Sequence, residues 1–144
     1  MTSPILFDYW RSSASYRVRI ALNLKGVAYE RVSINLAGGA QKEADYRARN
    51  PQGLVPMLEM DGLKLTQSLA IIDYLDAAIA EPPLLPADPG ERAHVRALAL
   101  AIACDIHPLN NLRVLQYLKR ELDHSQDEVD DWYRHWIVTG LPAL

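Results

Sequence analysis

A cluster of hydroxyl and guanidinium side chains occupies the segment Arg11-Ser12-Ser13-Ala14-Ser15, and Arg17 follows two residues later. The segment lies between a predicted strand and a predicted helix. Unsatisfied N–H groups and the helix dipole favour an anion there by about 0.3–1 kcal/mol at an exposed site. A single serine would only cap the helix, and that alternative stays open for each of them. Three serines with two arginines exceed what a cap needs, so we predict a thiolate site, because such surroundings lower the pKa of a thiol.

Two further segments have features of a ligand site. Pro56 in Gly53-Leu54-Val55-Pro56 directly precedes a predicted strand, so it either starts that strand or forms a cis bond. A cis bond would turn the N–H and C=O of Val55 outward to pair with an extended peptide. Gln67-Ser68 stands at another helix start, where a carboxylate would bind. Two anion sites separated by a peptide-pairing edge suit a short peptide acid.

Apolar spacing predicts the elements that hold these segments. The order is β-α-β-α-β-β-α, with a hairpin at Asp61-Gly62 and a helix capped by Ser68 whose apolar stripe is Leu69, Ile72 and Leu75. The expected strands are 4–9, 32–36, 57–60 and 63–65, the first two parallel; the expected helices are 15–25, closed by Gly26, then 45–49 and 69–75.

A proline-rich segment, EPPLLPADPG, separates this half from an all-helical one. We expect a domain at 1–81, a linker at 82–90 and a partial helical domain at 91–144. Its predicted helices are 91–104, 109–122 and one opened by the capping box Ser125-Gln126-Asp127-Glu128, which holds Trp132 and Trp136. The apolar end at Leu144 suggests a shortened chain.

Composition excludes several classes of protein. A net charge of −3 without a Lys/Arg cluster disfavours nucleic acid, and the single Cys104 forms neither an internal disulfide nor a CxxC pair, so any reacting thiol must come from a second molecule. His94, Asp105 and His107 give no convincing three-ligand metal set. The N-terminal residues show no basic region followed by an apolar one, so we do not expect them to be a signal peptide, and the longest uncharged run is far below the roughly 20 residues that span a bilayer. We therefore expect a soluble, cytoplasmic protein.

Four stretches, SSASYRVRIALNLKG, NPQGLVPMLEMDG, QSLAIIDYLD and LLPADP, resemble the zeta class of glutathione S-transferases, the maleylacetoacetate isomerase family, in order and spacing. The resemblance covers nearly the whole chain. It implies a thioredoxin-like N-terminal domain with a cis Pro56, an all-α C-terminal domain, homodimerisation and glutathione as cofactor. Relatives have Cys where this chain has Ala14, and full-length members continue through further helices that supply a substrate-binding arginine.

The resemblance also implies roles for particular residues. Ser12, Ser13 and Ser15 would be catalytic and, with Arg17, would surround the glutathione sulfur. Arg11 and Arg17 are candidate clamps for a substrate carboxylate, with surface salt bridges as the alternative. The other cofactor-binding positions that the resemblance implies are Ala14, Tyr16, Gln41, Val55, Gln67, Ser68, His107 and Asn111.

The expected function is glutathione-dependent cis–trans isomerisation of maleylacetoacetate in aromatic amino acid catabolism. The thiolate adds to the conjugated carbon, the former double bond rotates, and the thiolate leaves. The stretch CDIHPLNN with LQYL resembles the bacterial maleylpyruvate isomerases, which makes maleylpyruvate the alternative substrate. An alternative of another class is a non-catalytic glutathione-binding fragment that lacks the remaining helices.

Overall fold

The computed structural model describes residues 3–144 and divides into two compact units between Leu85 and Pro86. The first unit holds a four-stranded sheet in the order β2-β1-β3-β4. β1 pairs with β2 in parallel and with β3 antiparallel, and β3 pairs antiparallel with β4. Its strands are β1 (Ile5–Asp8), β2 (Glu30–Ser33), β3 (Met57–Met60) and β4 (Leu63–Thr66); its helices are α1 (Ser13–Leu24), η1 (Ala40–Lys42), α2 (Ala44–Arg49) and α3 (Ser68–Ala78).

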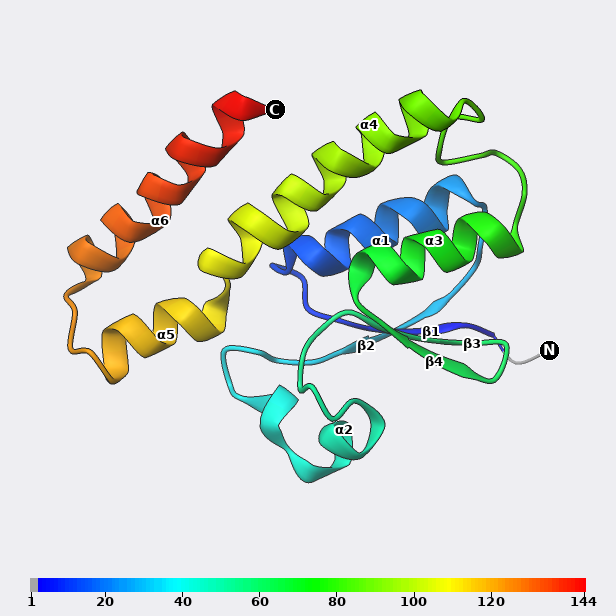
Figure 1. The fold of residues 1–144 in the computed structure, drawn as a ribbon. Helices are drawn as coiled ribbons and strands as arrows, with labels where there is room; N and C mark the ends of the chain where they lie inside the picture. The colour runs from blue at the N-terminus through cyan, green and yellow to red at the C-terminus, as the bar shows by residue number, and fades with distance from the viewer. Residues whose placement is uncertain (1–2) are drawn as a thin grey trace. The chain divides into compact units, whose positions relative to one another are not determined.

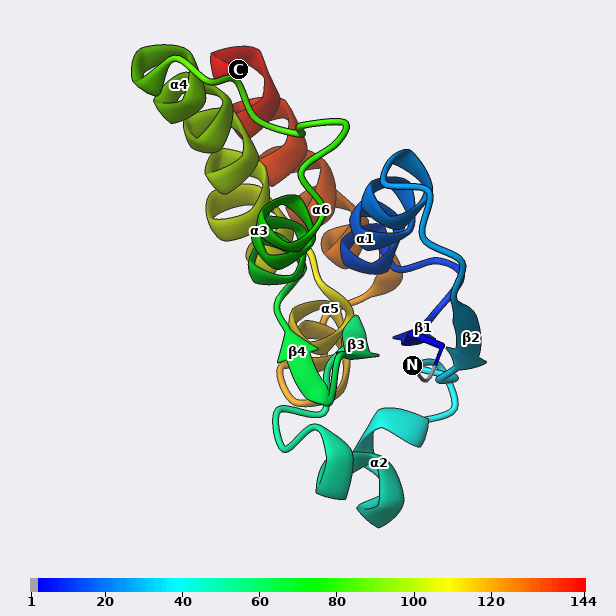
Figure 2. The same ribbon diagram turned by 90° about the vertical axis from the view of Figure 1, so that its right-hand side faces the viewer.

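Helices cover both faces of this sheet. α1 and α3 lie side by side on one face, and α2 lies on the other (Figures 1 and 2). Because successive side chains of a strand point to opposite faces, Leu6 joins the core under α1 and α3 while Phe7 joins the core beside α2. The first core contains Val18, Leu22, Leu58, Ile71 and Leu75; the second contains Ile34, Tyr46 and Met57. The predicted β-α-β-α-β-β-α order is confirmed.

Turn chemistry fixes several boundaries as predicted. Asp61 and Gly62 both have positive φ, at 54° and 77°, which is the conformation that a two-residue hairpin turn with primed geometry requires. Gly26 has φ 66° directly after the helix end, as expected of a C′ glycine. β2 begins at Glu30, two residues before the predicted start, because its parallel register places Glu30 opposite Ile5.

One prediction for α3 is wrong, and another is confirmed only in part. Ser68 is the first helical residue rather than its cap; Gln67 stands at the N-cap position and its side chain makes no capping hydrogen bond. The fully buried apolar side chains of the helix are Ile71 and Leu75, whereas Leu69 and Ile72 are half-buried. Ser68, Ile71 and Leu75, spaced three and four residues apart, form the stripe of the helix that faces the core.

A buried lysine joins α1 to the end of α3. The Lys25 ammonium group donates to Asp76 Oδ1 at 2.7 Å and to the carbonyls of Ile79 and Pro82, each at 2.6 Å. Its three hydrogen-bond donors therefore meet three acceptors, which is what a buried ammonium group requires. Asp76 Oδ1 also accepts from Leu84 N, so this cluster fixes the segment that leaves the first unit.

The second unit, residues 86–144, contains helices joined by short loops, and its described residues form no strand. α4 starts at Pro89, inside the predicted linker, because Asp88 caps it and a proline is tolerated in the first turn. The predicted 91–104 helix becomes π-helical after Leu100. α6 packs against α5 and against the π-helical η2, and its predicted capping box is confirmed. The elements are α4 (Pro89–Leu100), η2 (Ala101–Ile106), η3 (His107–Leu109), α5 (Leu112–Arg120), α6 (Gln126–Gly140) and η4 (Leu141–Ala143).

Candidate functional site

One edge of the sheet brings together the three segments that the sequence analysis identified and the short helix η1, which holds Gln41. The parallel strands β1 and β2 both end at this edge. The register Phe7↔Met57↔Thr66 places the start of β3 and the end of β4 there too. The serine segment, η1, the Val55-Pro56 bond and Gln67-Ser68 therefore all leave the sheet at the same edge, within the first unit.

Ser12 combines a structural role with a free donor. It is the N-cap of α1, and its Oγ accepts a hydrogen bond from Ser15 N at 3.1 Å. The cap uses only an acceptor lone pair, so the hydroxyl proton remains available to a second group. The side chain is half-buried at a helix N-terminus, where the dipole favours an anion. Ser12 can therefore cap α1 and contact a ligand at the same time.

The neighbouring residues differ in exposure. Ser13 is exposed and Ala14 is half-buried. Ser15 is fully buried on the core face of α1 with Val18 and Leu22, and its Oγ has no hydrogen-bond partner among the described residues. This burial separates Ser15 from the more accessible Ser12, and contact between Ser15 and a ligand stays a prediction.

The aromatic and basic residues around the serines pair by stacking. The Arg11 guanidinium lies over the Trp10 ring at 5.6 Å, and Arg19 lies over the Tyr16 ring at 5.2 Å. Arg11 and Tyr16 are exposed, while Arg17 is half-buried. One exposed arginine, Arg11, therefore stands beside the N-terminus of α1, where it could contact an acidic ligand.

The loop before β3 depends on two residues that the sequence analysis did not single out. The Tyr46 hydroxyl donates to Leu54 O at 2.6 Å, and Asn50 Nδ2 donates to the same oxygen at 2.8 Å. Burial raises the pKa of Tyr46, more than its hydrogen bond with Asn50 lowers it, so the phenol keeps its donor proton. The pair Asn50-Pro51, directly after the predicted helix 45–49, is the signal that could have suggested an anchor here.

Gln41 lies against this loop. A Cβ added at Gly53, whose φ is 61°, would stand 2.9 Å from Gln41 O, so the two backbones approach too closely for any other residue at that position. Gln41 Oε1 is buried and accepts no hydrogen bond from the described residues. An unused buried acceptor of this kind needs a donor.

The far side of the edge carries the second predicted anion site. The Val55-Pro56 bond is cis, as the resemblance implied, and Glu81-Pro82 is a second cis bond that was not predicted. Gln67 adopts φ 67° and ψ 116°, a conformation that costs a non-glycine residue about 1–3 kcal/mol and is concentrated at functional sites. Its Nε2 donates to Gln52 Oε1 at 3.0 Å, and Ser68 beside it is almost fully buried.

The two predicted site residues of the second unit have structural positions of their own. Asn111 caps α5 by accepting from Val114 N at 3.3 Å, and His107 is half-buried at the start of η3. Their roles toward a ligand stay predictions.

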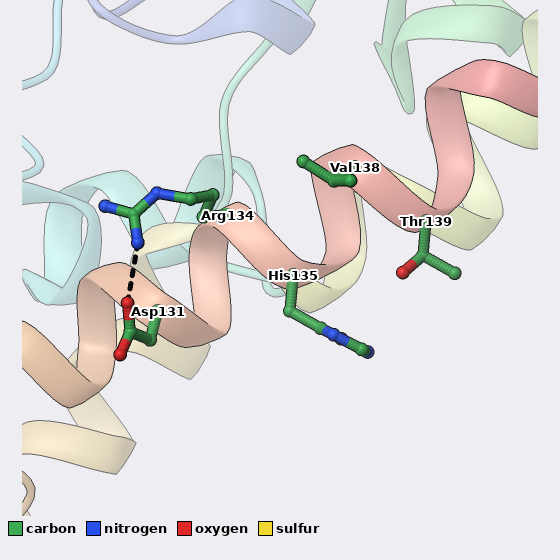
Figure 3. A pocket seen from close by; sticks show the side chains of 5 residues that line it. All are labelled: Asp131, Arg134, His135, Val138 and Thr139. Atoms are coloured by element: carbon green, nitrogen blue, oxygen red, sulfur yellow. Dashed lines mark hydrogen bonds and ion pairs between the residues drawn. The ribbon is translucent and has the colours of Figure 1, made fainter.

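A hollow on α6 in this unit is lined by one helix alone (Figure 3). It holds the Arg134–Asp131 pair at 2.6 Å, with His135 turned away from that pair. No second element is among its lining residues, so it does not enclose a ligand. The described residues also contain no group of three side chains suited to a metal ion, and no helix among them is long and apolar enough to cross a membrane.

Comparison with known proteins assigns the class. Residues 3–77 match the N-terminal domain of glutathione S-transferase. The chain is 52% identical to a probable maleylacetoacetate isomerase of Vibrio cholerae over 100% of its own length and 68% of that relative. It is 44% identical to a maleylpyruvate isomerase of a Ralstonia species, with 96% of this chain and 65% of the relative covered. The chain therefore belongs to the glutathione S-transferase family.

Solved structures place it more finely. A maleylpyruvate isomerase described as a bacterial zeta-class glutathione S-transferase superposes with a TM-score of 0.94 at 44% identity, over 96% of this chain and 66% of that one. A maleylacetoacetate isomerase from Methylobacterium extorquens, solved with malonate and glutathione, gives 0.93 at 46% identity over 96% and 65%. The predicted zeta-class resemblance and the thioredoxin-like fold are confirmed. The chain spans about two thirds of the length of these relatives.

Proposed function

We propose that the chain binds glutathione at the described sheet edge and forms part of a glutathione-dependent cis–trans isomerase that acts on maleylacetoacetate. The observation that carries the proposal is Ser12, whose Oγ caps α1 as an acceptor and keeps a proton to donate to sulfur. About half of the residues are identical to those of proteins named maleylacetoacetate isomerase.

The residues at the edge fit the chemical groups of glutathione. Gln67 and the N-terminus of α3 would hold the carboxylate of the γ-glutamyl end. The backbone of Val55 would pair with the peptide, and the buried Oε1 of Gln41 offers an acceptor that the described residues leave unused. Ser12, half-buried at the start of α1, would face the sulfur.

When bound, glutathione supplies a thiolate that adds to the substrate double bond and later leaves. The protein's part is electrostatic and positional. The Ser12 hydroxyl would donate a hydrogen bond to the sulfur, and the N-terminal dipole of α1 favours the negative charge of that sulfur. The thiolate form of glutathione would therefore persist near neutral pH. Arg11 and Arg17 would orient substrate carboxylates, and Ser13, Ala14 and Tyr16 would line the site beside Ser12.

We further propose the wider setting implied by the resemblance. Residues 1–81 would form the glutathione-binding domain, 82–90 the linker and 91–144 part of a helical domain in a cytoplasmic homodimer. His107 and Asn111 would contact the cofactor from that domain. Maleylpyruvate is the alternative substrate, supported by the Ralstonia relative and by the structure with the TM-score of 0.94.

The decisive experiment follows the absorbance of maleylacetoacetate and, separately, of maleylpyruvate, with and without glutathione. Turnover that requires glutathione supports the isomerase and names its substrate. Glutathione binding by calorimetry without turnover of either acid supports the non-catalytic fragment instead. Absence of both binding and turnover contradicts the proposal.

Removing the Ser12 hydroxyl tests its role directly. Ser12→Gly keeps most of the helix cap, since glycine caps cost only a few tenths of a kcal/mol more than serine caps. We expect kcat to fall about tenfold or more, equivalent to about 1.4 kcal/mol of transition-state stabilisation. The matched control is Ser125→Ala, which deletes a capping hydroxyl of α6 and should leave kcat unchanged. An unchanged kcat in Ser12→Gly would assign the role to Ser13 or to backbone N–H groups.

A further inference from the structure

A buried carboxylate stands at the end of β1, directly before the loop that leads to Ser12. The Asp8 side chain is 1% exposed, and its Oδ2 accepts from Arg31 Nε at 2.9 Å and pairs with Arg31 Nη2 at 2.6 Å. Arg19 Nη1 lies 3.6 Å from the same oxygen. The carboxylate thus joins an arginine of β2 to an arginine of α1.

Arg19 makes a second contact that Arg31 does not. Its Nη2 donates to the main-chain oxygen of Trp10 at 3.4 Å, in the loop between Asp8 and Ser12. The same loop is closed by a hydrogen bond from Ser12 N to Tyr9 O at 2.9 Å. The Arg19 side chain is 17% exposed, so it is largely held within the protein.

We propose that Arg19 is a positioning residue for Ser12. Its planar guanidinium contacts both the Asp8 carboxylate at the end of β1 and the Trp10 carbonyl. It also stacks on Tyr16 of its own helix. These contacts fix the turn in which Ser12 both ends the loop and caps α1. The inference rests on the proposed function in one respect, that the Ser12 hydroxyl serves the glutathione sulfur.

Removal of Arg31 and removal of Arg19 should have opposite rankings in their effects on stability and on activity. Arg31 makes the shorter contacts with Asp8, so its removal should cost more folding free energy than removal of Arg19. Among the described residues, the hydrogen bond and the ion pair of Arg31 both go to Asp8, and neither reaches the loop. If Arg19 acts only as an ion-pair partner of Asp8, the variant that loses more folding free energy should also lose more activity. If Arg19 positions Ser12, activity should fall in the Arg19 variants, which lose the hydrogen bond to the Trp10 carbonyl, and not in the Arg31 variant.

The test compares Arg19→Met, Arg19→Lys and Arg31→Met in the 144-residue chain. The first readout needs no ligand: hydrogen exchange at the Ser12 amide, which should become at least about fivefold faster in both Arg19 variants and stay unchanged in Arg31→Met. Arg19→Lys keeps the charge but lacks the fork that reaches two acceptors, so we expect it not to restore protection. Urea unfolding should rank Arg31→Met as the least stable variant.

The second readout uses glutathione. At saturating cofactor, we expect kcat and the ultraviolet absorbance of bound thiolate to fall about threefold to tenfold in Arg19→Met, and to stay unchanged in Arg31→Met. The affinity for S-methylglutathione, which has no thiolate, should be equal in all variants.

Three outcomes would overturn the inference. These are normal Ser12 protection in Arg19→Met, equal losses of kcat in Arg19→Met and Arg31→Met, or full recovery by Arg19→Lys. A wild-type chain that neither binds glutathione nor turns over substrate would overturn the proposed function, and the inferred link to sulfur with it, whereas the exchange result would still decide whether Arg19 holds the loop.

Discussion

The two units bury their apolar side chains to different degrees. In the first, Leu6, Leu58 and Ile71 are completely buried between a sheet and its helices. In the second, the described residues that are both hydrophobic and buried are Ile106 and Val129. Ile106 packs so closely against Gly140 of α6 that a Cβ added to this glycine would lie 2.6 Å from the Ile106 side chain.

The difference follows from architecture. A sheet with helices on both faces closes two cores with side chains from nearby strands, because each strand contributes to both faces. Each amphipathic helix, by contrast, buries its apolar stripe only where another element covers it. Leu100, Leu122 and Val138 accordingly remain 48%, 51% and 63% exposed. The candidate site lies in the unit whose core is closed, which provides the rigid support that precise hydrogen bonding to a ligand requires.

The largest effect is expected from Lys25→Met in the first unit. The substitution leaves Asp76 and two carbonyls without the buried ammonium group, and breaking a buried ion pair in this way costs about 3–5 kcal/mol. Urea unfolding measures the loss, and hydrogen exchange should locate it in residues 3–85. Lys64→Met, at an exposed position on β4, should change stability by less than about 0.5 kcal/mol. Equal losses in both variants would contradict the anchoring role.

A pair of truncations tests the comparison between the units. Leu58→Ala removes a completely buried side chain and should cost about 2–5 kcal/mol. Ile102→Ala removes one that is 41% exposed and should cost less than about 1 kcal/mol. Denaturation curves of the two variants give both values. A loss in Ile102→Ala as large as that in Leu58→Ala would show that the apolar face of the second unit is covered in solution.

The ends of helices and strands were predictable where residues close in sequence determine them. The Asp61-Gly62 hairpin, the Gly26 helix end and the Ser125 capping box each depend on residues close in sequence, and all three are confirmed. The N-terminus of α3 was not predictable in this way, because Gln67 adopts a positive φ that residue type does not favour. Which face of that helix is buried is decided by its packing against the sheet.

The sequence pointed to the segments of the candidate site, whose roles stay predictions, but not to the residues that support them. The segments that hold Ser12, Val55 and Gln67 leave the sheet at one edge because of the strand order β2-β1-β3-β4, of which the sequence analysis predicted the parallel first pair and the hairpin but not the pairing of β1 with β3. Asn50 and Tyr46 were missed because their hydrogen bonds to Leu54 O exist only after the chain has folded. The burial of Ser15, in contrast, could have been expected from its spacing with Val18 and Leu22.

The smallest effect is an acid response of the second unit. Hydrogen bonds from Ser125 N and Ser125 Oγ, and then His124, hold the pKa of Glu128 below its usual value. A lowered pKa in the folded state stabilises α6 above the ordinary carboxyl pKa, and this contribution is lost as pH falls through the folded value. The urea midpoint, followed by the fluorescence of Trp132 and Trp136, should therefore decrease slightly below about pH 4.

Substitution of the carboxylate isolates this contribution. Glu128→Gln should remove part of the acid response, because the neutral amide has no proton to gain. Glu121→Gln, which alters an exposed carboxylate outside α6, should leave the response as in the wild type. If the two variants respond alike, the capping box does not control the acid stability of α6, and other carboxylates, such as Asp131 paired with Arg134, must account for that sensitivity.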